Sequence, residues 1–181
     1  MDSTTIAAAL KAAVPDAEVE PAESRDGHAV IYAPAVRIAE IARALRDAPE
    51  LRFGFLAELT AVDFFPREPR YEVVYVLVSI ERRLRLRLKV RLPGTDAHLS
   101  TVTGVWPAAN WLEREVWDLF GIAFDGHPDP RRLLMPEDWD GFPLRKDYPV
   151  QIRMPARTHE ALQVTEEEFR QNVQRDRLTR R

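Results

Sequence analysis

Two strand-like runs lie next to each other in the stretch YEVVYVLVSIERRLRLRLKVRL, residues 71–92. From Arg83 to Leu92 a positively charged side chain alternates with an apolar one at every step, and this two-residue period is typical of a strand with one buried face. From Val73 to Val78 the chain is apolar throughout, which favours a strand that is covered on both faces. The stretch therefore predicts two strands of a sheet.

The residues before this stretch extend the same architecture. Phe55–Phe65 is a third candidate strand, and His28–Tyr32 is a short fourth one. Apolar residues at helical spacing predict helices at Ser3–Val14 and Ala35–Ala48. Helices packed on a mainly antiparallel sheet make an α+β fold.

Composition excludes several classes of site. The chain has 181 residues, of which 45% are hydrophobic, a formal net charge of −3 and no cysteine. Without cysteine, disulfides, thiolate zinc sites, cysteine nucleophiles and thiolate-bound iron–sulfur clusters are excluded. The glycines form neither a dinucleotide-binding nor a phosphate-binding loop. Because no run approaches the ~18 apolar residues of a membrane span and the N-terminus lacks the pattern of a signal peptide, we expect a soluble cytoplasmic protein.

A third helix is predicted over residues 110–120, NWLEREVWDLF. Its first residue, an asparagine, is a good N-cap, Glu113 completes a variant of the capping box, and Gly121 fits a left-handed C-cap. Glu115 falls at the edge of the apolar stripe, whereas Arg114 and Asp118 share the opposite side, where they can form an i,i+4 ion pair. The apolar stripe consists of Leu112, Val116, Leu119 and Phe120.

The chain changes character after this helix. Six prolines fall in the 28 residues from Pro128 to Pro155, so this stretch is predicted to be extended. Its large apolar side chains cannot be buried by an extended arm alone, so the arm either wraps its own domain or docks on a partner. A short helix is expected from Glu166 to about Leu178, with Thr165 and Glu168 as a capping box. The predicted division is an α+β domain, residues 1–125, and an extended proline-rich arm with a terminal helix, residues 126–181.

Two patterns suggest chemistry. The cations from Arg83 to Arg91 can bind nucleic acid or an acidic protein, but no aromatic residue interleaves with them, so we interpret them as a solvated or partner-facing side of the sheet. Metal sites and acid–base pairs use carboxylates with histidine, and the candidates are Glu113, Glu115, Asp118, His127 and Asp129. Capping accounts for Glu113, pairing accounts for Asp118, and no second histidine is nearby. A metal-dependent hydrolase built on Glu115 and His127 remains an alternative.

A longer pattern resembles a known family. It runs through Glu113-Arg114-Glu115, Asp118-Leu119-Phe120-Gly121-Ile122, Gly126-His127-Pro128-Asp129, Arg131-Arg132-Leu133-Leu134, Pro136-Glu137-Asp138-Trp139 and Leu144-Arg145-Lys146-Asp147-Tyr148-Pro149. These motifs resemble the C-type subunit, also called the 30-kDa-type subunit, of NADH:quinone oxidoreductase, which is respiratory complex I.

The resemblance implies a non-catalytic structural and assembly subunit in the peripheral arm of a proton-translocating complex. Such a protein holds no cofactor, because FMN and the iron–sulfur clusters belong to partner subunits. Its expected neighbours are the D-type subunit, which resembles a hydrogenase large subunit and helps to form the quinone site, and the small cluster-bearing B-type subunit. It lies on the cytoplasmic face of the bacterial cell membrane, attached only through these partners, and binds no nucleic acid.

Besides the metal-dependent hydrolase, two alternatives to this function stay open. One is the equivalent subunit of a related membrane-bound hydrogenase-type complex, since similar subunits serve several such complexes. The other is a nucleic-acid-binding module that uses the strand from Arg83 to Arg91, for which weak and salt-dependent binding is the expected mark.

The resemblance assigns interface residues, and we expect no catalytic, cofactor-binding or metal-ligating residue. We predict that Glu115 pairs with Arg131, Arg132 or an arginine of a partner, because a half-buried carboxylate needs a counter-charge. Leu144 and Tyr148, with the charges between them, are predicted to form a docking latch. The signature and interface residues are Glu113, Arg114, Glu115, Asp118, Leu119, Phe120, His127, Arg131, Leu144, Arg145, Lys146, Asp147 and Tyr148.

Overall fold

The structure, a computed structural model, describes residues 1–149 and 165–171. The chain forms two compact units, Met1–Tyr148 and Pro149–Arg181. Residues 126–148, which the sequence analysis assigned to the extended arm, therefore pack within the first unit. The physical reason is a dense set of polar contacts between this segment and the helix before it, which no local pattern reveals.

The described part of the second unit contains a helical segment, residues 166–171. Its capping box is the predicted one. The Glu168 carboxylate accepts a hydrogen bond from the backbone N–H of Thr165 at 3.0 Å, and Thr165 Oγ1 accepts one from the N–H of Glu168 at 3.3 Å. The rest of the predicted helix, up to Leu178, lies outside the described residues.

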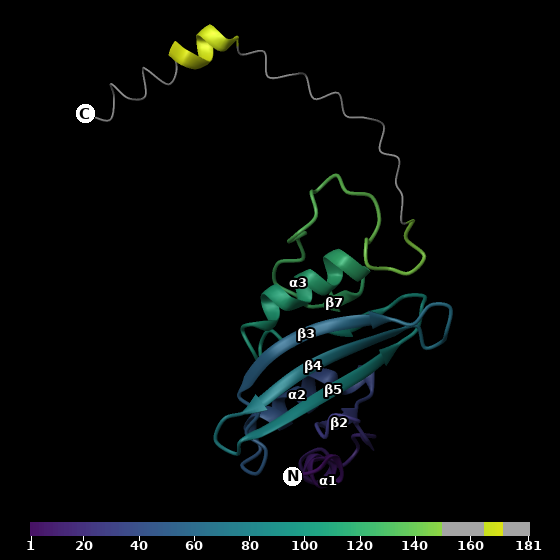
Figure 1. Ribbon diagram of the computed structural model, residues 1–181. Helices are drawn as coiled ribbons and strands as arrows, with labels where there is room; N and C mark the ends of the chain where they lie inside the picture. Colours follow the sequence, from purple (N-terminus) through teal and green to yellow (C-terminus); the bar gives the residue numbers. More distant parts are fainter. Residues whose placement is uncertain (150–164, 172–181) are drawn as a thin grey trace, which may run out of the picture. The chain divides into compact units, whose positions relative to one another are not determined.

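Five strands form the main sheet of the first unit, in the order β1-β2-β5-β4-β3 (Figure 1). Neighbours β3, β4 and β5 are antiparallel, as are β1 and β2, whereas β2 and β5 are parallel. The predicted α+β fold with a mainly antiparallel sheet is confirmed. The strands are β1 (Glu20–Ala22), β2 (Ala29–Tyr32), β3 (Phe55–Asp63), β4 (Tyr71–Ser79) and β5 (Leu84–Leu92).

Helices cover one face of this sheet, and their buried residues form a single core cluster with the sheet. Figure 1 shows α2 behind the strands and α3 along β3. On β5, Leu86, Leu88 and Val90 are fully buried, so the alternating cations belong to the opposite face, which we call the outer face. The helices are α1 (Ser3–Ala13), the 3-10 turn η1 (Ala35–Arg37), α2 (Ile38–Asp47) and α3 (Ala109–Phe120).

Strand β4, which lies between β5 and the edge strand β3, differs from its prediction. Val73, Tyr75 and Leu77 are fully buried in the core, whereas Val76 and Val78 are only half-buried on the outer face. Among the described residues, no helix lies over that face (Figure 1). The continuous apolar run is therefore covered on one side by its own chain, although its composition is that of a strand covered on both.

Three short strands and one helix start were not predicted. Strand β1 and the two strands of a small parallel sheet, β6 (His98–Ser100) and β7 (Ala123–Asp125), have three residues each, which is too few for a recognisable period. Helix α3 begins at Ala109, and its N-cap is Ala108, which has no polar side chain to cap with. The prediction of Asn110 as the N-cap is therefore wrong, because Asn110 lies inside the first turn, and Glu113 is bonded to the backbone of Val102 instead. Gly121 does form the predicted left-handed C-cap, with φ 72°.

Candidate functional site

The signature residues meet where α3 contacts residues 126–148, a segment that we call the strap. Asp118 is fully buried, and its Oδ2 accepts hydrogen bonds from three successive backbone N–H groups of the strap. Its Oδ1 accepts one from Arg132 at 2.7 Å. Burial raises the pKa of Asp118, but these donors outweigh burial and hold the pKa below its usual range. The three N–H groups are those of Leu133 (3.0 Å), Leu134 (2.7 Å) and Met135 (2.8 Å).

Arg114 binds the residues of the strap that come just before those held by Asp118. Its guanidinium donates to the carbonyl oxygens of Arg131 and Arg132, both at 3.0 Å, and lies 3.3 Å from a carboxylate oxygen of Asp129. The predicted i,i+4 pair with Asp118 is therefore wrong, and the side of α3 opposite the apolar stripe, which carries both residues, is buried. The strap covers that side and satisfies each charge separately.

Glu113 does not cap α3. It is fully buried, and its carboxylate accepts hydrogen bonds from the backbone N–H of Val102 at 2.7 Å and from the hydroxyl of Thr101. Burial raises its pKa to about 7, with these two donors acting in the opposite direction. A small cavity of about 100 Å³ lies between Glu113, Trp117 and His127.

The ring of His127 makes two contacts with the backbone. Its Nδ1 faces the backbone N–H of Asp129 at 3.0 Å, so Nδ1 is the acceptor and Nε2 donates to the carbonyl of Asn110, also at 3.0 Å. The nearest carboxylate oxygen of Glu113 is 3.9 Å from Nε2, which is too far for a hydrogen bond. His127 therefore holds the start of the strap to α3, whereas Glu113 holds α3 to the loop at Thr101 and Val102.

Glu115 pairs with neither Arg131 nor Arg132, the two predicted partners from its own chain. Arg131 pairs with Asp129 at 2.6 Å, and Arg132 pairs with Asp118. Glu115 is half-buried on α3. Its pairing with an arginine of a partner stays a prediction. Of the other signature residues on α3, Phe120 is buried and Leu119 is half-buried.

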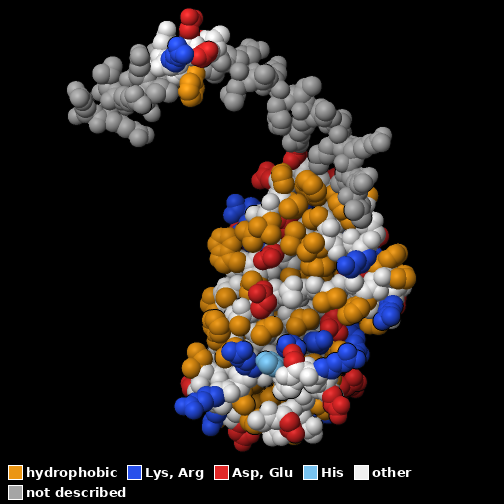
Figure 2. Space-filling model, in the orientation of Figure 1, with side chains coloured by type: hydrophobic (Ala, Val, Ile, Leu, Met, Phe, Trp, Pro, Cys, Tyr) orange, Lys and Arg blue, Asp and Glu red, His pale blue; other side chains and the backbone are white. Residues whose placement is uncertain are grey.

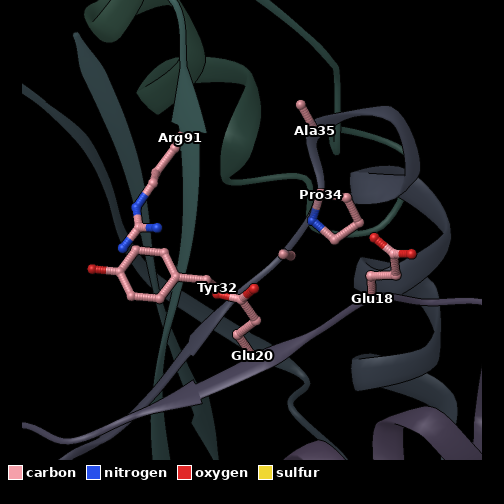
Figure 3. Close-up of a pocket in the computed structure, with 7 residues that line it drawn as sticks. Glu18, Glu20, Tyr32, Pro34, Ala35 and Arg91 are labelled. Atoms are coloured by element: carbon pink, nitrogen blue, oxygen red, sulfur yellow. The ribbon is translucent and has the colours of Figure 1, made fainter. Parts of the chain in front are cut away.

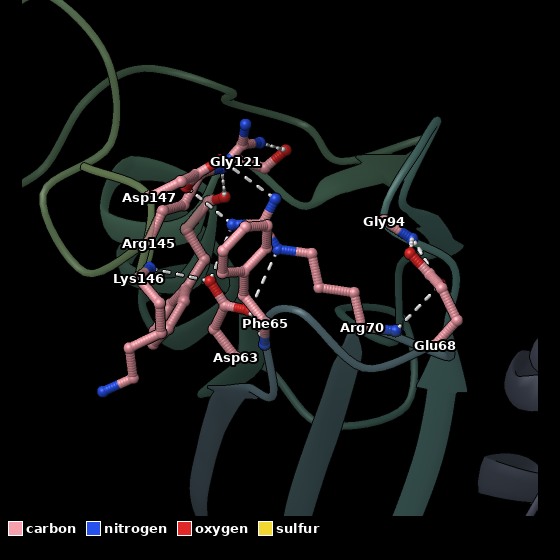
Figure 4. A network of polar contacts seen from close by, with 10 residues as sticks. Asp63, Phe65, Glu68, Arg70, Gly94, Gly121, Arg145, Lys146 and Asp147 are labelled. Carbon is pink, nitrogen blue, oxygen red and sulfur yellow. Dashed lines mark hydrogen bonds and ion pairs between the residues drawn. The ribbon is translucent and has the colours of Figure 1, made fainter.

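An ion network ties the end of the strap to the sheet (Figure 4). The fully buried carboxylate of Asp63, the last residue of β3, accepts two hydrogen bonds from Arg70, at 2.9 and 2.8 Å, and one from the backbone N–H of Lys146 at 2.8 Å. Arg70 also pairs with Asp147 at 2.6 Å. Burial raises the pKa of Asp63, but Arg70 and the backbone donors outweigh it and lower the pKa to about 2.

Asp63 and Arg70 were not among the site residues predicted from the sequence, although the sequence contains a signal for Asp63. Asp63 follows Leu59 and Ala61 at the alternating positions of β3 that face the core. A carboxylate at such a position needs a buried counter-charge or several donors.

The latch predicted at residues 144–148 divides into two sets of side chains. Arg145 donates to the carbonyl of Phe120 at 2.6 Å, and Asp147 pairs with Arg70, so both hold the strap to its own domain. Tyr148 donates to the carbonyl of Asp140 at 3.1 Å. Leu144 is 48% exposed and Lys146 is exposed, so these two side chains are accessible to a partner.

An open pocket of about 260 Å³ lies between β1, β2 and β5 (Figure 3), and no signature residue lines it. Its charged groups are Glu18, Glu20 and Arg91, whose guanidinium carbon stacks 3.8 Å from the ring centre of Tyr32. Within residues 1–149 and 165–171, no three His, Asp or Glu side chains converge as metal ligands do. Over the same residues, the helices are too short or too polar to cross a bilayer.

Comparison with known proteins gives consistent matches. The family model for "Respiratory-chain NADH dehydrogenase, 30 Kd subunit" matches residues 31–153. The C subunit of NADH-quinone oxidoreductase from Roseiflexus sp. (strain RS-1) is 51% identical over 150 residues, which are 83% of this chain and 86% of that protein. The C/D subunit of NADH-quinone oxidoreductase from Methylococcus capsulatus (strain ATCC 33009 / NCIMB 11132 / Bath) is 50% identical over 132 residues, which are 69% of this chain and 22% of that protein.

Two solved structures are similar in fold. The trypsin-resistant fragment (1-134) of Nqo5 has 34% sequence identity and a TM-score of 0.57, over 71% of this chain and 99% of that one. A chain of the membrane-bound sulfane sulfur reductase, an archaeal respiratory membrane complex, has 28% identity and a TM-score of 0.67, over 81% of this chain and 85% of that one. With its family model matched over residues 31–153, the chain belongs to the family of the 30-kDa subunit of respiratory-chain NADH dehydrogenase.

Proposed function

We propose that this chain is a non-catalytic structural subunit in the peripheral arm of a proton-translocating NADH:quinone oxidoreductase. The observation that carries the proposal is how the signature charges are used. Arg114 and Asp118 are buried and fully engaged in holding the strap, so neither is available to bind or transform a substrate. Apolar side chains of the same strap face outward, with Leu134 56% exposed. A rigid segment that presents apolar groups suits protein docking.

The neighbour that we propose is the D-type subunit, the hydrogenase-large-subunit-like protein that helps to form the quinone site. The relative from Methylococcus capsulatus carries the C and D subunits in one chain, which supports their direct contact. We further propose the cluster-bearing B-type subunit as a neighbour, FMN and iron–sulfur clusters in the partner subunits, and a position on the cytoplasmic face of the membrane. The likeness to a chain of the sulfane sulfur reductase supports a second candidate, the equivalent subunit of a related membrane-bound complex.

The proposal is tested by isolating the complex with the tagged full-length chain from native membranes in gentle detergent. We expect mass spectrometry to find the D-type and B-type subunits with it, and the preparation to oxidise NADH and reduce quinone. Recovery of these proteins without NADH oxidation would support the second candidate. Recovery of the chain alone, or with nucleic acid, would contradict both.

Matched variants locate the docking residues. We expect Leu134→Asp and Leu144→Asp to lower recovery of the partners at least about tenfold, because an aspartate in a desolvated apolar contact is strongly unfavourable. Val36→Asp is the control, since Val36 is 90% exposed on η1 and lies outside the strap. Equal recovery in all three variants would show that the strap does not dock.

A further inference from the structure

The outer face of the sheet has an apolar centre. Val76 and Val78 of β4 belong to this face, and Phe55 and Val62 of β3 extend it. Phe55 is 52% exposed. Figure 2, which looks onto this face, shows hydrophobic side chains gathered over β3 and β4. A sheet face that meets only water normally carries polar side chains, so valines on the inner strand β4 indicate a face that another molecule covers.

Uncompensated positive charge borders one corner of this apolar centre. Strand pairing places Phe55, Val78 and Arg85 in one cross-strand row, and Ile80 in the adjoining turn is 75% exposed. In the described part of the chain, neither Arg85 nor Arg83 has a salt-bridge partner. The cations further along β5 are already compensated: Arg87 pairs with Asp26, and Lys89 pairs with Glu72.

We infer that this corner is a second docking surface, for a partner protein segment with an apolar ridge bordered by carboxylates. The inference rests on the proposed function, because it requires that the chain works inside a complex. The apolar ridge covers Phe55, Val78 and Ile80. The carboxylates pair with Arg83 and Arg85, two guanidinium groups that their own chain leaves without counter-charge.

Two other occupants fit these charges less well. A second copy of the chain brings the same row of cations. Of the two carboxylates that β3 and β4 carry on the outer face, Glu58 and Glu72, the latter is already paired with Lys89. A bilayer requires side chains that project into it. At this corner Phe55 and Ile80 are exposed, whereas Val76 and Val78 are half-buried between their neighbours, so the corner offers a bilayer two separate side chains rather than a continuous projecting surface.

The test uses the full-length chain in its membrane complex, with a photoreactive benzoyl-phenylalanine in place of Phe55. We expect illumination to link this position to one other subunit, through a peptide that contains apolar residues and Asp or Glu. Arg85→Glu in the same background should lower the yield of that product about tenfold, because attraction becomes repulsion. The matched control is Arg43→Glu, at an exposed arginine of α2, which should leave the yield unchanged.

Other outcomes overturn the inference. One is a cross-linked product with a second copy of the chain, with residues 150–181 of the same chain, with lipid or with nucleic acid. The other is an assembled complex in which position 55 gives no cross-linked product. A complex that forms while Phe55 links to nothing refutes this surface alone and leaves the proposed function intact. A chain that enters no complex refutes both.

Discussion

Replacing Asp63 by asparagine tests the network that ties the strap to the sheet. Asp63 is fully buried and accepts hydrogen bonds from Arg70, whose side chain is itself only 9% exposed, and from the backbone of Lys146. Asparagine keeps the size of the side chain but removes the negative charge and one acceptor oxygen. Breaking a buried ion pair costs about 3–5 kcal/mol. Because Asp147 remains 2.6 Å from Arg70, we expect the lower end, about 3 kcal/mol of unfolding free energy.

The measurement is urea unfolding of the full-length chain followed by circular dichroism, with limited proteolysis to detect release of the strap. Asp16→Asn is the control, since its carboxylate is 91% exposed and 4.0 Å from Arg37, and it should cost less than about 0.5 kcal/mol. If Asp63→Asn also costs under about 1 kcal/mol, the network does not hold the strap and the reasoning is refuted.

Asp63 should also make the stability of the fold depend on pH in the acid range. The pKa of Asp63 falls from 3.8 to about 2 on folding, so its contribution to stability is complete above about pH 4 and is lost as the pH falls through 2. The shift corresponds to about 2 kcal/mol. Asp63→Asn should therefore lose less stability between pH 4 and pH 2 than the unmodified chain does; identical losses would assign the acid dependence to other carboxyls.

Two further predictions concern α3. Burial raises the pKa of Glu113 from 4.5 to about 7, so the contribution of this residue to stability is greatest below pH 4.5 and falls by about 3 kcal/mol as the pH rises to 7. Glu113→Gln should therefore melt at a higher temperature than the unmodified chain at pH 8 but not at pH 4.5. A lower melting temperature of the variant at pH 8 would contradict this. Gly121→Ala should destabilise the domain by about 2 kcal/mol in urea unfolding, because φ is 72° and the added Cβ would collide with Arg145 and Phe142; an unchanged midpoint would mean that the strap can move away.

Family membership could be read from the sequence because its motifs are contiguous, whereas the contacts that these motifs make could not. The helical spacing around α3 placed Arg114 and Asp118 opposite the apolar stripe and paired them with each other, since a helical projection contains only the helix itself. In the structure the strap covers that side, and three backbone N–H groups of residues 133–135 converge on one carboxylate. Glu113 failed as a cap for the same reason, because its partners Thr101 and Val102 belong to a separate loop.

By itself, the sequence determined the layers of this protein. The alternation from Arg83 to Leu92 is a local property of the chain, and it decided which side of β5 enters the core before any partner strand was known. Only the tertiary structure decided that Asp63 at the end of β3 meets Arg70 and the strap, which comes more than eighty residues later. The physical reason is the range of the interactions. The period of the apolar residues depends only on which side chains of one element face the core and which face water. A buried charge is stabilised by hydrogen-bond donors and counter-charges that folding brings together from distant parts of the chain.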